Sequence, residues 1–181
     1  DRSTASVDGS LFSEEDRAFV SGWKSADEVQ PSRFREHLSS IPAENLLKAT
    51  GYIRMPMEIE DGNPMLPVTI DGREGTLIAD TGATSTLINT RLADMAGIVL
   101  SEGPYVLTWQ GRLKTFKGNA KVIRIGSDVT LHDVEISATE QSSESFHGLL
   151  GIDLMRKVGA VLDFGKSEVY LRQARSERSE E

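Results

Sequence analysis

Asp80 is the residue of this sequence best placed to carry out chemistry. It directly follows the largely apolar run 76–79 and precedes Gly82 by two residues. A carboxylate can act as a general base on water when its position is rigid and its environment restrains ionisation. Gly82 permits a tight backbone turn that lets a substrate approach, and the Thr81 hydroxyl can lock this turn by hydrogen bonding. The tripeptide therefore predicts a general base at the end of a core strand.

A second motif lies in the last third of the chain, where an apolar pair and a glycine open a short helix: Leu149, Leu150 and Gly151. Together with the stretch Leu77–Ser85, this motif resembles the retropepsin-like aspartic proteases, which include retroviral enzymes and single-lobed bacterial and eukaryotic relatives. The resemblance covers about residues 52–171. It implies that Asp80 is catalytic, that Thr81 forms cross-subunit hydrogen bonds, and that the later motif braces the catalytic loop around Gly82.

The family also has a glycine-bearing hairpin, the flap, between these two motifs, and the stretch Thr108–Arg112 lies where a flap is expected. Lids of this kind exclude water from a reacting site and close over bound substrate. The resemblance implies substrate-binding residues at the flap tip and beside the catalytic turn: Trp109, Gln110, Gly111, Ala83 and Thr84. Trp109 has an alternative role as a packed strand residue.

The number of catalytic motifs predicts a homodimer. Two carboxylates in contact cannot both ionise cheaply, so such a pair shares one proton and supplies one base and one acid. This chain has one Asp-Thr-Gly and no Asp-Ser-Gly, so the pair requires Asp80 from each of two chains on a two-fold axis. The expected reaction is hydrolysis of peptide bonds in a protein or peptide substrate, with no cofactor, no metal and no covalent intermediate, at acidic pH.

Several alternatives remain beside this interpretation. Asp80 can be a simple turn residue after a buried strand. Asp153 and Asp163 are predicted to be a helix-start residue and a hairpin residue rather than second catalytic aspartates. The chain can also be a noncatalytic retropepsin-like module that dimerises or binds peptides, or an inactive monomer that awaits removal of residues 1–50.

The composition excludes several other classes of function. The chain has 20 basic and 28 acidic residues and a formal charge of -8, which argues against a nucleic-acid partner. It has no cysteine, so disulfides and thiolate chemistry are excluded. The three histidines are scattered without metal-ligand spacing and are predicted to lie on the surface: His37, His132 and His147. No serine hydrolase motif is present.

The two ends of the chain predict little about its compartment. No apolar run approaches the roughly 18 residues that a membrane helix needs, and the first residues are not a signal peptide. A start without methionine indicates a mature or trimmed form. With the single-lobed relatives, this favours a bacterial protein that is secreted or periplasmic, and a cytoplasmic location stays open.

The elements that position these residues follow from hydrophobic periodicity and turn residues. The alternation predicts strands at residues 52–59, 66–70, 76–79, 86–88, 105–109, 114–116, 120–125 and 129–136, and a terminal hairpin at 160–171. Asp71-Gly72 predicts a two-residue hairpin turn, and Gly111, Gly118 and Gly126 are expected at bends. Two short helices are predicted, one capped by Asn89 and one after Gly151.

The predicted fold is therefore mostly β, a retropepsin-like closed barrel with short helices. Residues 1–50 are expected to form a helical N-terminal extension, which includes a capped helix near residues 13–23. Residues 51–172 are expected to form the protease-like domain, and residues 173–181 a charged tail. The extension can act as a prosegment, a dimer clamp or an adaptor, and its sequence does not choose among these roles.

Overall fold

The computed structural model describes residues 42–108, 111–141 and 143–173, and the chain divides into two units, residues 1–53 and 54–181. In the first unit, helix α3 (Ala43–Ala49) begins after Pro42, where a proline suits the start of a helix because its missing N–H is not needed there. The predicted helix near residues 13–23 and the tail at 174–181 lie outside the described residues.

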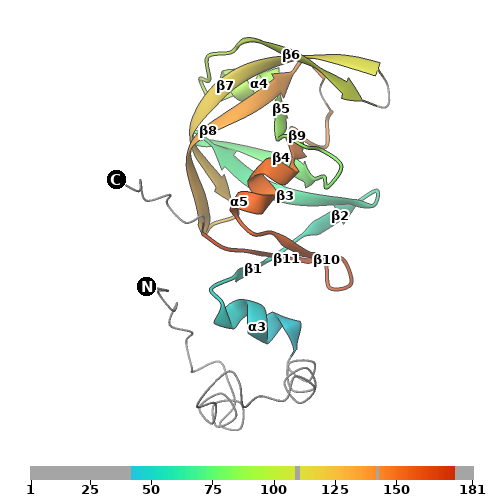
Figure 1. The fold of residues 1–181 in the computed structure, drawn as a ribbon, viewed down its shortest axis with the longest axis vertical. Helices are drawn as coiled ribbons and strands as arrows, with labels where there is room; N and C mark the ends of the chain where they lie inside the picture. The colour runs from blue at the N-terminus through green and yellow to red at the C-terminus, as the bar shows by residue number, and fades with distance from the viewer. Residues whose placement is uncertain (1–41, 109–110, 142, 174–181) are drawn as a thin grey trace, which may run out of the picture. The chain divides into compact units, whose positions relative to one another are not determined.

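The second unit is built around an eight-stranded sheet with the order β2-β3-β4-β9-β5-β8-β7-β6 (Figure 1). A further pairing joins β3 to β7, so hydrogen-bonded neighbours run in a ring from β3 through β4, β9, β5, β8 and β7 back to β3. The strand bounds are β2 (Glu58–Glu60), β3 (Asn63–Ile70), β4 (Arg73–Ala79), β5 (Leu87–Asn89), β6 (Ser101–Thr108), β7 (Gly111–Ile125), β8 (Val129–Thr139) and β9 (Gly148–Leu150).

A separate three-stranded sheet has the order β1-β11-β10, formed by β1 (Ile53–Pro56), β10 (Val161–Asp163) and β11 (Glu168–Leu171). The last two strands are the predicted terminal hairpin, with Val161 opposite Tyr170 and Asp163 opposite Glu168. The mostly β class predicted from the sequence is confirmed. None of the helices in the described ranges is long and apolar enough to cross a membrane.

The core of the second unit consists of apolar side chains from these strands. Burial alternates along residues 67–70 of β3, as one buried strand face requires, whereas the last three residues of β4 are all buried. The largest fully buried members of the core include Leu66, Leu77, Ile88, Ile136 and Leu150. Burial of each such side chain contributes about 1.5–3 kcal/mol relative to exposure. Leu77 lies on β4 and Leu150 on β9, so the core directly supports the strand ends that precede Asp80 and Gly151.

Local sequence rules account for the turns and helix ends. Asp71 and Gly72 have φ values of 46° and 82° between β3 and β4, as a two-residue hairpin turn of this type requires. Helix α4 (Thr90–Met95) is capped by Asn89, whose Oδ1 accepts from the Leu92 N–H at 2.8 Å. Helix α5 (Ile152–Lys157) follows Gly151. Both predicted helices are confirmed.

The prediction of separate strands with a bend at Gly118 was wrong. β7 runs without interruption from Gly111 to Ile125 and pairs along most of its length with β8. Gly118 lies inside this strand. A larger residue would not fit there, because a Cβ would come within 2.6 Å of the Ile98 Cγ2 atom. The glycine therefore serves close packing rather than a change of chain direction.

Candidate functional site

Asp80 lies where the buried strand β4 ends. Strands β4 and β9 are parallel, with Ala79 opposite Leu150, so their carboxyl ends meet at one edge (Figure 1). Leu77, Ile78 and Ala79 are at most 9% exposed, whereas Asp80 is half-buried. The Asp80 N–H donates to the Leu150 carbonyl at 3.1 Å. The position of Asp80 is therefore fixed by two packed strands while its side chain reaches the surface.

The Asp80 carboxylate itself closes the turn that follows. Asp80 Oδ1 accepts from the Gly82 N–H at 2.8 Å, and the Asp80 carbonyl accepts from the Ala83 N–H at 3.2 Å. Thr81 is exposed, and its hydroxyl forms no hydrogen bond with any described residue, so the predicted lock of the turn by Thr81 is not made within that part of the chain. Among the same residues, Asp80 Oδ2 has no hydrogen-bond donor.

Gly151 brings the second motif against the turn. A Cβ at Gly151 would lie 2.4 Å from the Ser85 carbonyl carbon, so only glycine allows the two backbones to approach this closely. The next residue, Ile152, donates its N–H to the Ala83 carbonyl at 2.9 Å. Leu150 is fully buried and Leu149 half-buried. The structure thus places the motif 149–151 directly against the Asp80 turn.

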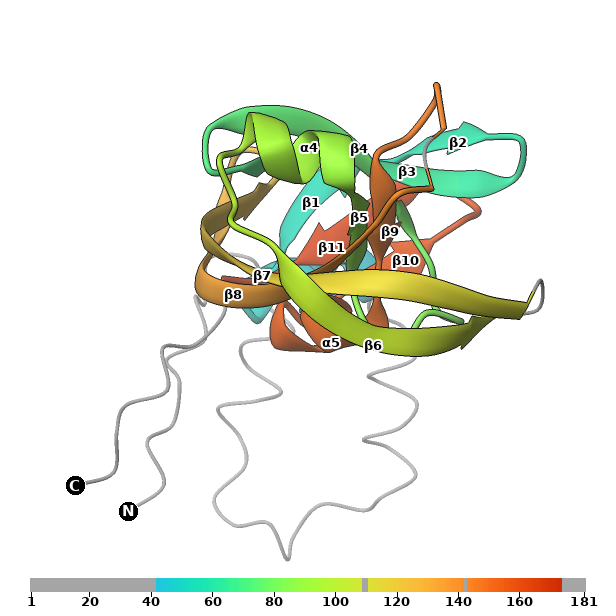
Figure 2. The same cartoon turned by 90° about the horizontal axis from the view of Figure 1, so that it is seen from above.

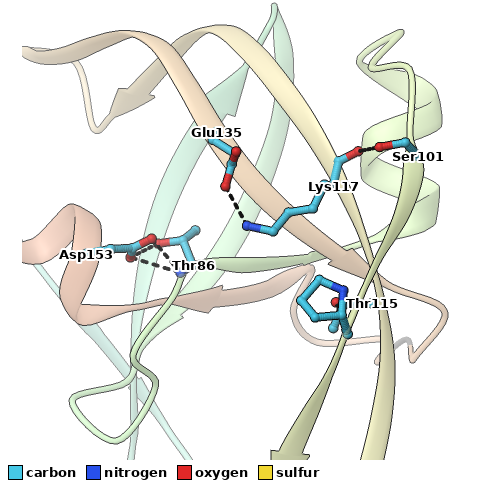
Figure 3. Close-up of polar contacts among 7 residues, drawn as sticks. Thr86, Ser101, Thr115, Lys117, Glu135 and Asp153 are labelled. Atoms are coloured by element: carbon cyan, nitrogen blue, oxygen red, sulfur yellow. Dashed lines mark hydrogen bonds and ion pairs between the residues drawn. The ribbon is translucent and has the colours of Figure 1, made fainter.

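Thr86 and Asp153 connect the far end of the turn to helix α5 (Figure 3). Thr86 is 1% exposed, and its hydroxyl accepts from the Gly151 N–H at 3.0 Å while donating to Asp153 Oδ1 at 2.7 Å. The Thr86 N–H also donates to the Asp153 carboxylate, at 2.9 Å to Oδ1. Asp153 lies in the first turn of α5 as predicted. Its bond to Thr86 was missed, because it joins residues 67 positions apart.

The hairpin of β6 and β7 projects on the same side of the domain as the loop between β4 and β5 (Figures 1 and 2). Thr108 pairs with Gly111 across its end. Gly111 is exposed with φ 121°, whereas Trp109 and Gln110 lie outside the described residues. Of the predicted substrate-binding residues beside the turn, Ala83 is half-buried and Thr84 is exposed.

Neither described histidine forms a hydrogen bond with Asp80. His132 is exposed, as predicted. His147, which was also predicted to lie on the surface, is half-buried, and its Nδ1 accepts from the Thr76 N–H at 3.1 Å. His37 lies outside the described residues. Within the described ranges, no group of three or more His, Asp or Glu side chains converges on a point that suits a metal ion.

Known proteins resemble this chain in sequence profile and in fold. Residues 66–154 match the sequence profile of a family described as aspartyl protease. The fold is similar to that of a retropepsin-like aspartic protease from Rickettsia conorii, with 20% identity and a TM-score of 0.55 over 68% of this chain and 92% of that chain. EIAV protease in complex with the inhibitor HBY-793 matches at 18% identity and a TM-score of 0.49, over 57% of this chain and 95% of that chain. No curated protein matches the sequence.

Proposed function

We propose that this chain, a member of the aspartyl protease family with the retropepsin-like fold, is a homodimeric aspartic endopeptidase. The family match covers residues 66–154. The proposed catalytic residue is Asp80. The observation that carries the proposal is the position of Asp80. Its backbone is tied to β9 through Leu150, whereas its Oδ2 has no hydrogen-bond donor among the described residues. This combination gives a rigid carboxylate with one oxygen available to water.

The proposed reaction requires a second carboxylate. Two carboxylates in contact share one proton, because ionisation of both at short range is unfavourable. The ionised member takes a proton from water as this water attacks the scissile carbonyl, and the protonated member donates to the carbonyl oxygen, which gives a tetrahedral diol. The first carboxyl then passes its proton to the amide nitrogen as the C–N bond breaks, and the diol returns a proton to the second carboxylate. The products are a carboxylic acid and an amine, and the pair again holds one proton. The two titrations belong to the pair, so activity is expected at acidic pH.

A second copy of the chain is the proposed source of this carboxylate. The sequence has one Asp-Thr-Gly. Asp153 is hydrogen-bonded to Thr86 at the end of the turn, but its carboxylate is already used to bind Thr86 and the Leu154 N–H. A two-fold axis beside the turn would bring both Asp80 side chains together. Thr81 and Thr84, which are both exposed, then lie at the proposed interface and substrate path.

The test is cleavage of an unstructured protein between roughly pH 4 and 6 by the wild type and by Asp80→Asn. The asparagine Oδ1 can still accept from the Gly82 N–H, so the turn is retained while the charge is lost. We expect the rate to fall on the order of 10²–10⁴-fold, the usual contribution of a general base.

Asp163→Asn is the matched control. The Asp163 Oδ1 accepts from the Lys166 N–H at 3.1 Å in the terminal hairpin, and an amide oxygen can replace it, so this variant should cleave at the wild-type rate. Equal cleavage by the wild type and Asp80→Asn would refute the proposed role of Asp80. No cleavage by any of the three proteins, if they are folded, would favour a noncatalytic peptide-binding module.

A further inference from the structure

The outer part of the β6–β7 hairpin is held by few contacts. We call residues 105–108 and 111–114 the distal arm. β6 is the last strand of its sheet, and β8 pairs with β7 only from Phe116 onward. The strands of the distal arm therefore pair only with each other. A two-stranded ribbon of this kind has little stability of its own, so its direction is set at its base.

A β-bulge lies at this base. Glu102 pairs with Phe116 and Tyr105 pairs with Lys114, so Gly103 and Pro104 together face Thr115. Bulges bend a strand and increase its twist. Pro104 has no N–H to donate, and a Cβ at Gly103 would come within 2.9 Å of the Thr115 carbonyl oxygen. The regular ladder is thus interrupted where the distal arm leaves the sheet.

The Thr115 side chain replaces the missing ladder contact. Thr115 is fully buried at 0% exposure, and its hydroxyl donates to the Pro104 carbonyl at 2.5 Å. Figure 3 places Thr115 where β6 and β7 run beside each other. The Lys114–Glu102 ion pair also spans the bulge, at 3.2 Å. Both of its side chains are exposed, so it contributes little. The Thr115 bond is thus the buried side-chain contact that fastens the bulged strand to its neighbour.

The distal arm exposes apolar side chains that the core does not cover. Tyr105 and Leu107 are 59% and 82% exposed on one face, where the Arg112 guanidinium lies 5.1 Å from the centre of the Tyr105 ring. Val106, opposite Leu113, is 41% exposed on the other face. Exposed apolar side chains on a projecting element are typical of a segment that covers a ligand. The distal arm extends on the same side of the domain as the Asp80 loop (Figures 1 and 2).

We propose that the bulge at Gly103–Pro104 is the pivot of the distal arm, and that Thr115 is a positioning residue that sets the angle of the distal arm over the Asp80 loop. The covering of a bound peptide by the distal arm rests on the proposed function. The pivot itself rests on the bulge, the burial of Thr115 and its bond to Pro104.

The chain has no natural cysteine, so two engineered cysteines can carry spin labels at chosen sites. Leu107→Cys labels the distal arm, and Lys121→Cys labels the exposed face of β7 beyond the pivot. Labelled full-length chain is refolded with excess unlabelled chain, so that each assembly holds one labelled copy. The distribution of distances between the two labels then reports the angle of the distal arm without any need for catalysis.

We expect Thr115→Val to broaden this distance distribution, because it removes the hydroxyl and keeps the side-chain shape. Thr115→Ser, which keeps the hydroxyl, should restore the wild-type distribution. Thr130→Val is the control, because Thr130 lies at the opposite end of the β7–β8 ladder, opposite Arg124. In cleavage assays, Thr115→Val should raise KM about threefold to tenfold, the effect of one lost hydrogen bond, with kcat changed less than about twofold.

A distribution unchanged by Thr115→Val, or broadened equally by Thr130→Val, would overturn the pivot. If Thr115→Val does not fold, Gly103→Ala replaces it as the test of the pivot. The added Cβ must push against the Thr115 carbonyl and shift the mean distance between the two labels. An unshifted mean distance would overturn the pivot. The pivot and the proposed function can fail separately. If Asp80→Asn loses cleavage and Thr115→Val leaves the distance distribution unchanged, only the pivot is refuted. If Thr115→Val broadens the distribution and the wild type does not cleave, only the proposed function is refuted.

Discussion

The roles proposed for two aspartates near the same turn differ because their oxygens have different partners. Asp80 Oδ1 accepts one hydrogen bond from its own turn, at the Gly82 N–H, and its Oδ2 is left for water in the proposed mechanism. Asp153 accepts from the Thr86 N–H, the Thr86 hydroxyl and the Leu154 N–H. A carboxylate with filled acceptor sites is a structural group, so Asp153 supports the turn that Asp80 uses.

Replacement of Asp153 by alanine should therefore destabilise the domain. Thr86 is buried, so its N–H and hydroxyl would lose their acceptor without access to water. We expect a loss of about 2–3 kcal/mol in the free energy of unfolding, as for buried hydrogen bonds to a charged group. Urea denaturation measures this loss. Asp163→Ala, which removes one exposed acceptor of the Lys166 N–H, should lose no more than about 1 kcal/mol, and equal losses for the two variants would contradict the role of Asp153.

The sequence was sufficient for local features at this scale. Asn89 was identified as a helix cap and Asp153 as a helix-start residue, because both assignments depend on neighbours a few positions away. The bond between Thr86 and Asp153, and the bond from the Thr76 N–H to His147, join residues 67 and 71 positions apart. Such pairs depend on strand register, which the sequence alone does not determine.

At the scale of elements, the three-residue strand β9 decides where the turn lies. β9 inserts between β4 and β5, parallel to one and antiparallel to the other. The motif at 149–151 was predicted to brace the loop through the family resemblance. Its formation of a strand in the main sheet was not predicted, because three residues carry too little periodicity. The length of β7 was missed because Gly118 was interpreted as a bend rather than as a packing contact with Ile98.

Gly151→Ala tests the close approach of β9 to the turn. The added Cβ would lie 2.4 Å from backbone carbon of Ser85, so one of the two segments must move. We expect a loss of about 3 kcal/mol or more in unfolding free energy, with cleavage lost in parallel. Thermal or urea unfolding provides the measurement.

Gly62→Ala is the matched control for this substitution. Gly62 has φ 80° in the β2–β3 turn, and nothing lies within 4 Å of a Cβ there, so only the backbone conformation is penalised. The expected loss is about 1–2 kcal/mol. If Gly151→Ala were no more destabilising than Gly62→Ala, the packing of the motif against the turn would not be what holds Asp80 in place.

At the scale of the whole molecule, the chain provides half of the proposed site. The ring of six strands, the Asp80 turn and the distal arm all belong to residues 54–181, whereas the second carboxylate would come from another copy. The class of fold could be predicted from the alternation of apolar and polar residues. The candidate catalytic motif could be predicted from one tripeptide, Asp-Thr-Gly. Apart from the cross-subunit bonds that the resemblance implies for Thr81, the proposed partner surface could not be predicted, because it depends on exposed side chains such as Thr84 whose spacing carries no period.

The most direct test of the paired Asp80 site is the activity of mixed dimers. Wild-type and Asp80→Asn chains are denatured together in equal amounts and refolded, so that chains pair at random. If each site needs Asp80 from both chains, only wild-type pairs cleave, and activity falls to about one quarter of that of the same total amount of wild type. A mixture with Asp163→Asn in place of Asp80→Asn should keep full activity. A value of about one half, which is expected if each chain carries a complete site, would contradict the account.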